Sequence, residues 1–174
     1  WIFSTTSVWV YDKSTLKKPQ WNSTIFNSFP NSIQDIILEN GQVWIIGQNL
    51  VAHISENLES KIIVLPNVQN KYYFKGSVKL KHTLYIASKE RLLSLDTRNY
   101  KLSSSLIKDL GDKEDIWSIH KSADDTLWLG TDSGVLFKTV ESLEWHQFQP
   151  NKINYIIKSI SSSEEEIWFA TAMN

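Results

Sequence analysis

The chain has 174 residues, of which 41% are hydrophobic and 21% charged, and its formal net charge is −1. This composition is typical of a globular domain with a sizeable core, and the near balance of 18 basic and 19 acidic residues argues against a nucleic-acid-binding surface. There is no cysteine, which excludes disulfides and thiolate metal ligands, and no apolar run is long enough to insert into a membrane.

An aromatic residue recurs along the whole chain, about 40 to 43 residues apart, at Trp1, Trp44, Tyr85, Trp128 and Trp168. Each of these anchors is followed by two or three mostly apolar or small residues and then by polar ones. So regular a spacing indicates a structural repeat in which the anchor occupies the same place in every unit. We therefore expect the five anchors to be core residues.

Within each repeat the apolar residues alternate with the period of two that is typical of β-strands. First strands are expected at 32–37, 73–78, 115–120 and 155–160, each followed by an anchored second strand. A third strand follows, as in the segments that end at Asp12 and Asp96, and weaker fourth strands are expected at 25–29, 62–65, 102–107 and 145–148. Four short strands per repeat are typical of a β-propeller blade, and helix should be nearly absent.

The turn residues support this division. Blade-to-blade connections are expected at Pro30-Asn31, Pro66-Asn67, Gly111-Asp112 and Pro150-Asn151, because Pro and Asn favour turns and Pro cannot donate to a sheet. An all-β sandwich also has short strands and regular turns, but it gives no reason for one aromatic anchor to recur at a fixed interval. The sequence thus predicts an all-β propeller with about four consecutive four-stranded blades.

The repeat also indicates that these blades belong to a larger ring. The anchored second strand occurs five times and the other strand types four times, whereas a closed ring needs equal numbers. The chain begins at Trp1, without an initiator methionine or a signal peptide. We expect the remaining blades of the same protein to be its partners, and whether two copies form a homodimer stays open.

One repeat carries a recognisable motif. The segment 122–139 resembles the two-component-regulator propeller repeat at the positions Leu127, Trp128, Leu129, Gly130, Thr131, Gly134 and Val135. The copy at 43–47 lacks the threonine, and those at Tyr85 and Trp168 are degenerate. The resemblance implies a non-enzymatic sensor region of a bacterial hybrid histidine kinase or related signalling protein. It also implies a periplasmic location and a small-molecule or oligosaccharide ligand. We expect no cofactor.

By analogy with other propellers, a ligand should bind where the loops meet at one mouth of the central channel. Those loops join fourth to first strands and second to third strands. They contribute Asn31, Asn67, Asp112 and Asn151, together with Gln48, Lys89, Arg91 and Asp132. Lys89 and Arg91 are the strongest candidates, because they share a loop whose counterparts are neutral or acidic. Their charge would suit an anionic or polyhydroxylated ligand.

Other candidate groups favour structural roles. His53, His82, His120 and His146 are too scattered to suggest a metal site. Ser122-Ala123-Asp124 followed by Trp128 resembles the Asp-box turn of sialidase-like propellers, which is structural, and Asp124-Asp125 fit a solvated hairpin tip. Trp117 could face the channel, although packing between blades is favoured.

Two other functional classes compete with the sensor. A propeller enzyme similar to streptogramin lyase would need histidine and acidic residues that converge on the channel, and the scattered histidines do not indicate such a cluster. An intracellular interaction propeller with WD repeats should carry Gly-His and Trp-Asp dipeptides, which are missing.

Overall fold

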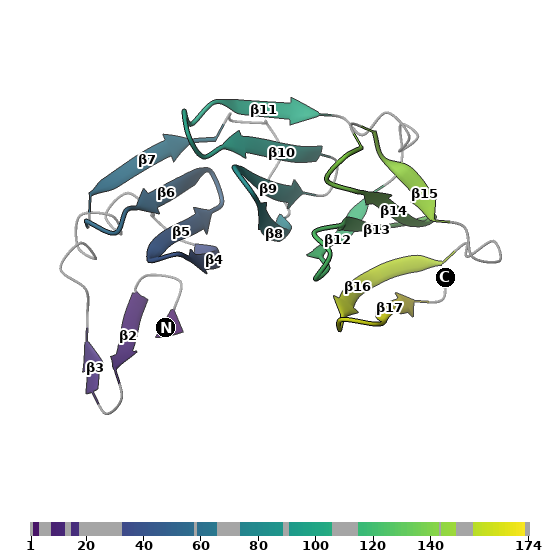
Figure 1. Ribbon diagram of the computed structural model, residues 1–174, viewed down its shortest axis with the longest axis horizontal. Coiled ribbons are helices and arrows are strands. Elements are labelled where there is room, and N and C mark those ends of the chain that lie inside the picture. The colour runs from purple at the N-terminus through teal and green to yellow at the C-terminus, as the bar shows by residue number, and fades with distance from the viewer. Residues whose placement is uncertain are drawn as a thin grey trace. The chain divides into compact units, whose positions relative to one another are not determined.

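The computed structural model describes residues 2–3, 8–12, 15–17, 33–57, 59–65, 74–88, 91–105, 115–142, 144–148 and 155–172. Within these ranges it contains seventeen β-strands and no helix, as the period of two predicts (Figure 1). The chain divides into two compact units, Trp1–Tyr72 and Tyr73–Asn174, which are described separately. The described segments include no helix that is long and apolar enough to cross a membrane.

Unit 1 contains two antiparallel sheets. The first has the order β1 (Ile2–Phe3), β2 (Val8–Asp12) and β3 (Thr15–Lys17). The second runs in chain order through β4 (Ile33–Glu39), β5 (Gln42–Gly47), β6 (Leu50–Ile54) and β7 (Ser60–Val64). Asn40 and Gly41 connect β4 to β5 with φ values of 48° and 71°, the left-handed conformation that a tight hairpin turn needs.

Unit 2 repeats the same architecture. One sheet consists of β8 (Phe74–Leu80), β9 (Thr83–Ser88), β10 (Arg91–Asp96) and β11 (Leu102–Ser105). The next consists of β12 (Ile116–Lys121), β13 (Leu127–Thr131), β14 (Gly134–Lys138) and β15 (His146–Phe148). A final pair is formed by β16 (Ile156–Ser162) and β17 (Ile167–Ala172).

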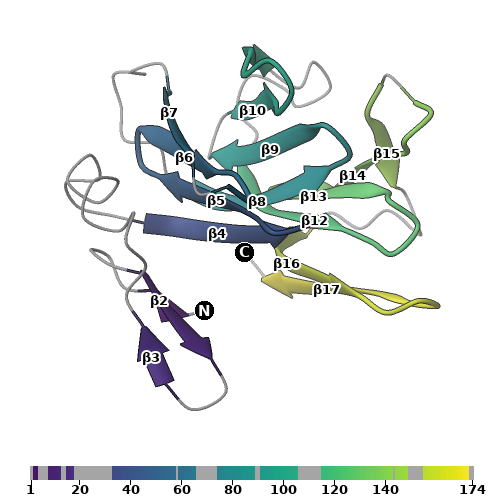
Figure 2. The ribbon, with the colours of Figure 1, turned by 60° about the vertical axis from the view of Figure 1, so that its left-hand side comes forward.

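The expected strand order is confirmed in every sheet that has four strands. Each is an antiparallel meander whose second strand carries the aromatic anchor, and the four expected first strands are found as β4, β8, β12 and β16. In unit 2, β12 packs against both β8 and β16, so that the first strands of successive sheets are neighbours (Figure 2). This is the arrangement of inner strands in a propeller. The fourth strand expected at 25–29 lies outside the described residues.

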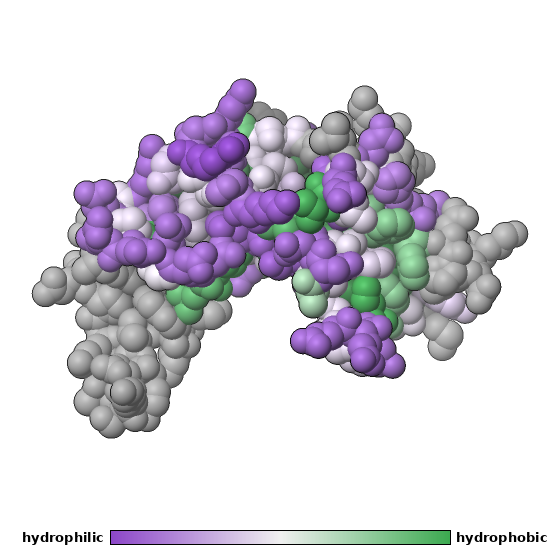
Figure 3. All heavy atoms as spheres, viewed as in Figure 1, coloured by the Kyte–Doolittle hydropathy of each residue, from purple (hydrophilic) through white to green (hydrophobic). Residues whose placement is uncertain are grey.

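Two of the anchors, Trp44 and Trp128, are part of the core. Trp44 has no exposed surface and stacks on His53, its partner on β6, with the ring centroids 4.0 Å apart. Trp128 is buried and lies opposite Phe137 of β14, and it also contacts Phe148 and Phe169. Hydrophobic residues are visible between β14 and β16, where this cluster lies (Figure 3).

The expectation of a buried anchor is wrong for Trp168, which is 51% exposed, and Tyr85 is only half-buried. Trp168 lies on β17, and no described strand pairs with the outer edge of β17. Trp44 and Trp128 are each covered by a side chain of the third strand, and Trp168 has no such cover among the described residues. Trp1 lies outside those residues.

The motif glycine Gly130 marks a close approach between neighbouring sheets. A Cβ atom placed there would lie 2.5 Å from the Ile157 carbonyl oxygen of β16 and would collide with Ser118 Oγ of β12. The following threonine closes the turn, since Thr131 Oγ1 donates to the Gly134 carbonyl at 3.2 Å and accepts from Ser133 N–H at 3.2 Å. Gly130 and Thr131 therefore serve sheet stacking and the β13–β14 turn.

The substitution Trp128→Ala should lower the free energy of unfolding by about 3–5 kcal/mol, because it removes a large buried ring and leaves a cavity. Urea unfolding monitored by circular dichroism measures the change. The matched control Trp168→Ala removes a half-exposed ring and should cost about 1 kcal/mol or less. Equal losses for the two variants would contradict the difference in burial.

The substitution Gly130→Ala should lower the free energy of unfolding by about 1–3 kcal/mol, because the added methyl group forces β13 away from β16. Alanine adopts an ordinary strand conformation without strain. The loss of stability would therefore come from the packing between sheets. The same unfolding experiment tests it, and a variant as stable as the original chain would rule out the close approach.

Candidate functional site

The predicted mouth residues that the structure describes are Arg91, Asp132 and Gln48. Asn31, Asn67, Lys89, Asp112 and Asn151 lie outside the described residues. Arg91 begins β10 and pairs with Ser88, whose Oγ donates to the Arg91 carbonyl at 2.9 Å. Ser88 in turn pairs with Phe74 at the start of β8. Arg91 is therefore at the end of its sheet where the first strand begins.

Asp132 lies in the β13–β14 turn at the corresponding end of the next sheet. Its Oδ2 accepts the Asp115 backbone N–H at 3.2 Å, and its Oδ1 accepts a short hydrogen bond from Trp117 Nε1. Both carboxylate oxygens therefore hold the start of β12. The role that the structure gives Asp132 is to orient the Trp117 indole ring.

A β-bulge occurs at the same place in every first strand. The register shifts lie between Ile33 and Asp35, between Phe74 and Gly76, between Ile116 and Ser118, and between Ile157 and Ser159. The extra residues are Gln34, Lys75, Trp117 and Lys158. A bulge leaves its extra residue without a ladder partner and changes the direction of the side chain, and bulges are frequent beside functional sites.

In unit 2 the three bulge residues meet. Lys75 Nζ lies 4.0 Å and Lys158 Nζ 2.8 Å from the centroid of the Trp117 ring, so that ammonium groups from both neighbouring sheets contact one indole. Trp117 and Lys75 are half-buried and Lys158 is exposed. We call Lys75, Trp117, Asp132 and Lys158 the mouth cluster.

Trp117 is contacted from both neighbouring blades, as packing between blades requires, and the contacting groups include the ammonium groups of Lys75 and Lys158. Cation–π contacts of this kind are favourable, and an ammonium group carries three hydrogen-bond donors and no acceptor. The cluster can therefore donate to an anionic or polyhydroxylated ligand. Lys75 and Lys158 were not predicted from the sequence as site residues, although both share their place in the repeat with Trp117.

The described histidines of unit 2 lie away from the mouth cluster. His120 Nε2 lies 2.8 Å from Ser162 Oγ, towards the hairpin end of β12, and burial lowers the pKa of its imidazole. His146 is on the outer strand β15 and His82 is in the β8–β9 turn. Among the described residues, no three His, Asp or Glu side chains are placed to hold a metal ion.

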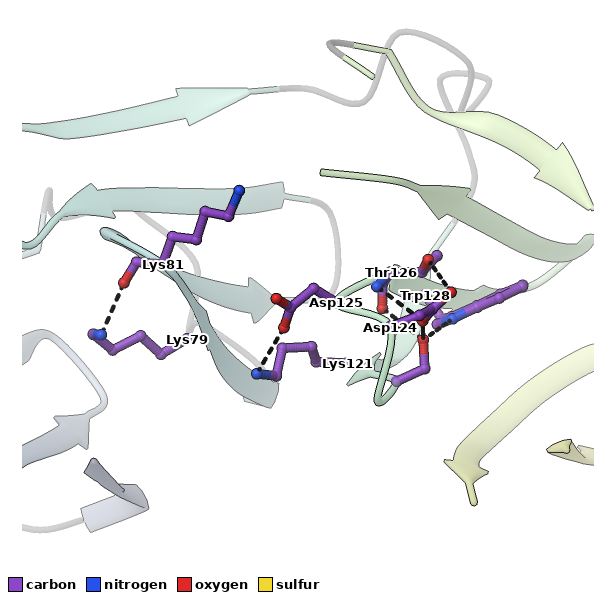
Figure 4. Close-up of polar contacts among 8 residues, drawn as sticks. Lys79, Lys81, Lys121, Asp124, Asp125, Thr126 and Trp128 are labelled. Atoms are coloured by element: carbon purple, nitrogen blue, oxygen red, sulfur yellow. Dashed lines mark hydrogen bonds and ion pairs between the residues drawn. The ribbon is translucent and has the colours of Figure 1, made fainter. Parts of the chain in front are cut away.

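The β12–β13 turn lies at the opposite end of the sheet and is a structural unit (Figure 4). Ser122 Oγ donates to Asp124 Oδ1 at 2.5 Å and accepts the Trp128 Nε1–H at 2.9 Å. Asp124 also accepts bonds from the Thr126 backbone N–H and hydroxyl. Asp125 pairs with Lys121 at 3.2 Å. The turn thus joins a hydrogen-bonded carboxylate to the buried anchor, as the resemblance to an Asp-box implies.

No family model matches the chain, and no curated protein matches it closely enough to count as a relative. Solved structures do match. The extracellular domain of a protein described as a one-component system of B. thetaiotaomicron superposes on 97% of the chain with a TM-score of 0.69 and 17% identity. The extracellular domain of a protein from the same organism, described as a hybrid two-component system, superposes on 95% with a TM-score of 0.63 and 19% identity. Virginiamycin B lyase from Staphylococcus aureus superposes on 95% with a TM-score of 0.67 and 14% identity.

The chain has the all-β propeller fold. The similarity extends over nearly its whole length, and the sheets are those of propeller blades. The chain spans about a quarter of the two extracellular domains, 24% and 23%, and 56% of the lyase. One fold therefore serves both extracellular domains of signalling systems and an enzyme.

The substitution Asp124→Asn should destabilise the chain at neutral pH. Ser122 lowers the pKa of the Asp124 carboxyl by its hydrogen bond, and Thr126 adds to the effect. A carboxyl whose pKa is lower in the folded than in the unfolded chain contributes stability above its unfolded pKa, and that stability is lost as the pH falls through the folded pKa. The measurement is urea unfolding of both chains at pH 7 and at about pH 3. The difference in the free energy of unfolding between the variant and the original chain should be smaller at the lower pH. A difference that does not change with pH would contradict the role of the charge.

Proposed function

We propose that this chain is part of a ligand-sensing β-propeller without enzymatic activity, in the extracytoplasmic, periplasmic region of a bacterial signalling receptor of the two-component type. The observation that carries the proposal is the likeness, over nearly the whole chain, to extracellular domains of two signalling systems. The motif at 127–135 supports it, because that segment resembles the repeat of two-component regulators. The ligand would be a small molecule or an oligosaccharide.

The polar groups at the mouth of unit 2 support binding in preference to chemistry. The mouth cluster offers ammonium donors and an indole, and Arg91 lies at the same end of the sheets. The described residues at this end include no imidazole that could act as a general base. Such a surface can orient and hold a ligand.

The second candidate function is that of a propeller lyase, which the similarity to virginiamycin B lyase favours. It requires a histidine and an acidic partner that converge on the mouth. In unit 2, His82 lies in a hairpin turn, His120 near the hairpin end of β12, and His146 on an outer strand. None of the three lies at the start of a first strand. The sensor therefore accounts better for the side chains that are present.

The sensor proposal predicts binding without turnover. The full chain, screened by thermal shift against oligosaccharides and organic acids, should be stabilised by a compound that is recovered unchanged in product analysis. Arg91→Ala should weaken binding of that compound by about tenfold, because it removes a cation from the mouth. Product formation from a bound compound would overturn the proposal in favour of the lyase.

The matched control is Arg98→Ala. Arg98 is exposed, and it pairs with Asp96 at 2.8 Å at the other end of β10. Its removal should leave the affinity unchanged. If Arg91→Ala and Arg98→Ala behave alike, Arg91 does not contact the ligand, whereas the binding itself would still support the sensor.

A further inference from the structure

We infer that the mouth cluster is an anion subsite, in which Lys75 and Lys158 together bind a carboxylate or sulfate group of a small acidic ligand. The inference rests on the proposed function and specifies which ligand chemistry the propeller recognises. The subsite would bind an acidic saccharide or another compact organic acid. Its evidence is the convergence of two cations from different blades on one indole.

The two ammonium groups are held close together. Since they lie 4.0 Å and 2.8 Å from one ring centroid, their nitrogen atoms are no more than about 7 Å apart. This separation is shorter than the Debye length of about 8 Å at physiological ionic strength, so salt does not fully screen their repulsion. An oxyanion placed beside both would relieve the repulsion and accept a hydrogen bond from each.

The carboxylate inside the cluster already has partners. Asp132 Oδ1 accepts from Trp117 Nε1 and Asp132 Oδ2 from the Asp115 backbone N–H. Asp132 thus fixes the ring on which both lysines rest. The cluster is consequently a preorganised support, in which the indole and the bulges hold the two charges before a ligand arrives.

The fold does not demand lysine at these bulges. The corresponding residue of unit 1 is Gln34, which is exposed and neutral, in a first strand with the same register shift. Trp117 itself occupies the same position in β12. Three residue types, one cationic and two neutral, are therefore compatible with one backbone geometry. The lysines at Lys75 and Lys158 are therefore better explained by what they bind than by the construction of the blade.

The test measures binding to the full chain by calorimetry. The probes are trigalacturonate, which carries carboxylates, its fully methyl-esterified form, which is neutral, and a sulfated chondroitin disaccharide. We expect one or both acidic probes to bind, the neutral ester to bind at least tenfold more weakly, and affinity to fall as salt rises from about 50 to about 300 mM. The preference between carboxylate and sulfate identifies the source of the anion.

The variants Lys75→Met and Lys158→Met keep a long side chain and remove its charge. Each should lower the affinity for the acidic probe by about tenfold or more. Lys158→Arg, which keeps the charge, should retain binding and also serves if a Met variant fails to fold. The matched control is Lys79→Met on the same strand as Lys75. Lys79 Nζ donates to the Lys81 carbonyl at 2.8 Å at the hairpin end of β8, so its loss should not affect binding (Figure 4).

Three results would overturn the anion subsite: no acidic probe binds, the neutral ester binds as well as the acid, or both Met variants bind as tightly as the original chain. A neutral compound found in the thermal-shift screen would then leave the sensor proposal intact. Conversely, acidic probes that bind through the two lysines and are cleaved would support the subsite and overturn the sensor.

Discussion

The close approach of one sheet to the next at Gly130 is the constraint on which the rest of unit 2 depends. With no side chain at Gly130, the backbone of β13 can lie against the Ile157 carbonyl of β16, where a Cβ would collide. That contact brings the first strands β12 and β16 together and encloses the Trp128 cluster between the sheets. Because the first strands become neighbours, their bulge residues come within reach of one another.

Much of this architecture can be predicted from the sequence because burial leaves a periodic trace. The alternation of apolar residues indicates each strand, and the recurring aromatic identifies the second strand of each blade. Trp168 shows the limit of the reasoning. Trp44 and Trp128 are covered by side chains of the strand that follows them, and β17 has no such neighbour among the described residues. A side chain's burial thus depends on tertiary context that its own segment does not encode.

The candidate site was harder to predict, since a β-bulge leaves no signature in a pattern of apolar residues. Lys75 and Lys158 fall in segments that read as ordinary strands, and only the register shows that each is an extra residue without a ladder partner. Aligning the repeats by the first strand, and not by the anchor, would place both beside Trp117. Asp132 was predicted as a ligand contact, and the structure shows it engaged with Trp117 and Asp115.

The two ends of the β12–β13 sheet carry different kinds of polar group, and this bears on how binding could be sensed. At the hairpin end, Ser122, Asp124 and Trp128 form a hydrogen-bonded unit that ties the turn to the core. At the mouth, the charged groups come from separate sheets, Lys75 from one and Lys158 from another, and both contact Trp117. A ligand changes a conformational equilibrium only by binding one state better than the other. An anion that bridges Lys75 and Lys158 would bind best when the three first strands are at their observed spacing. Binding at the mouth would therefore oppose separation of the blades, and the fold could register the ligand without changing it chemically.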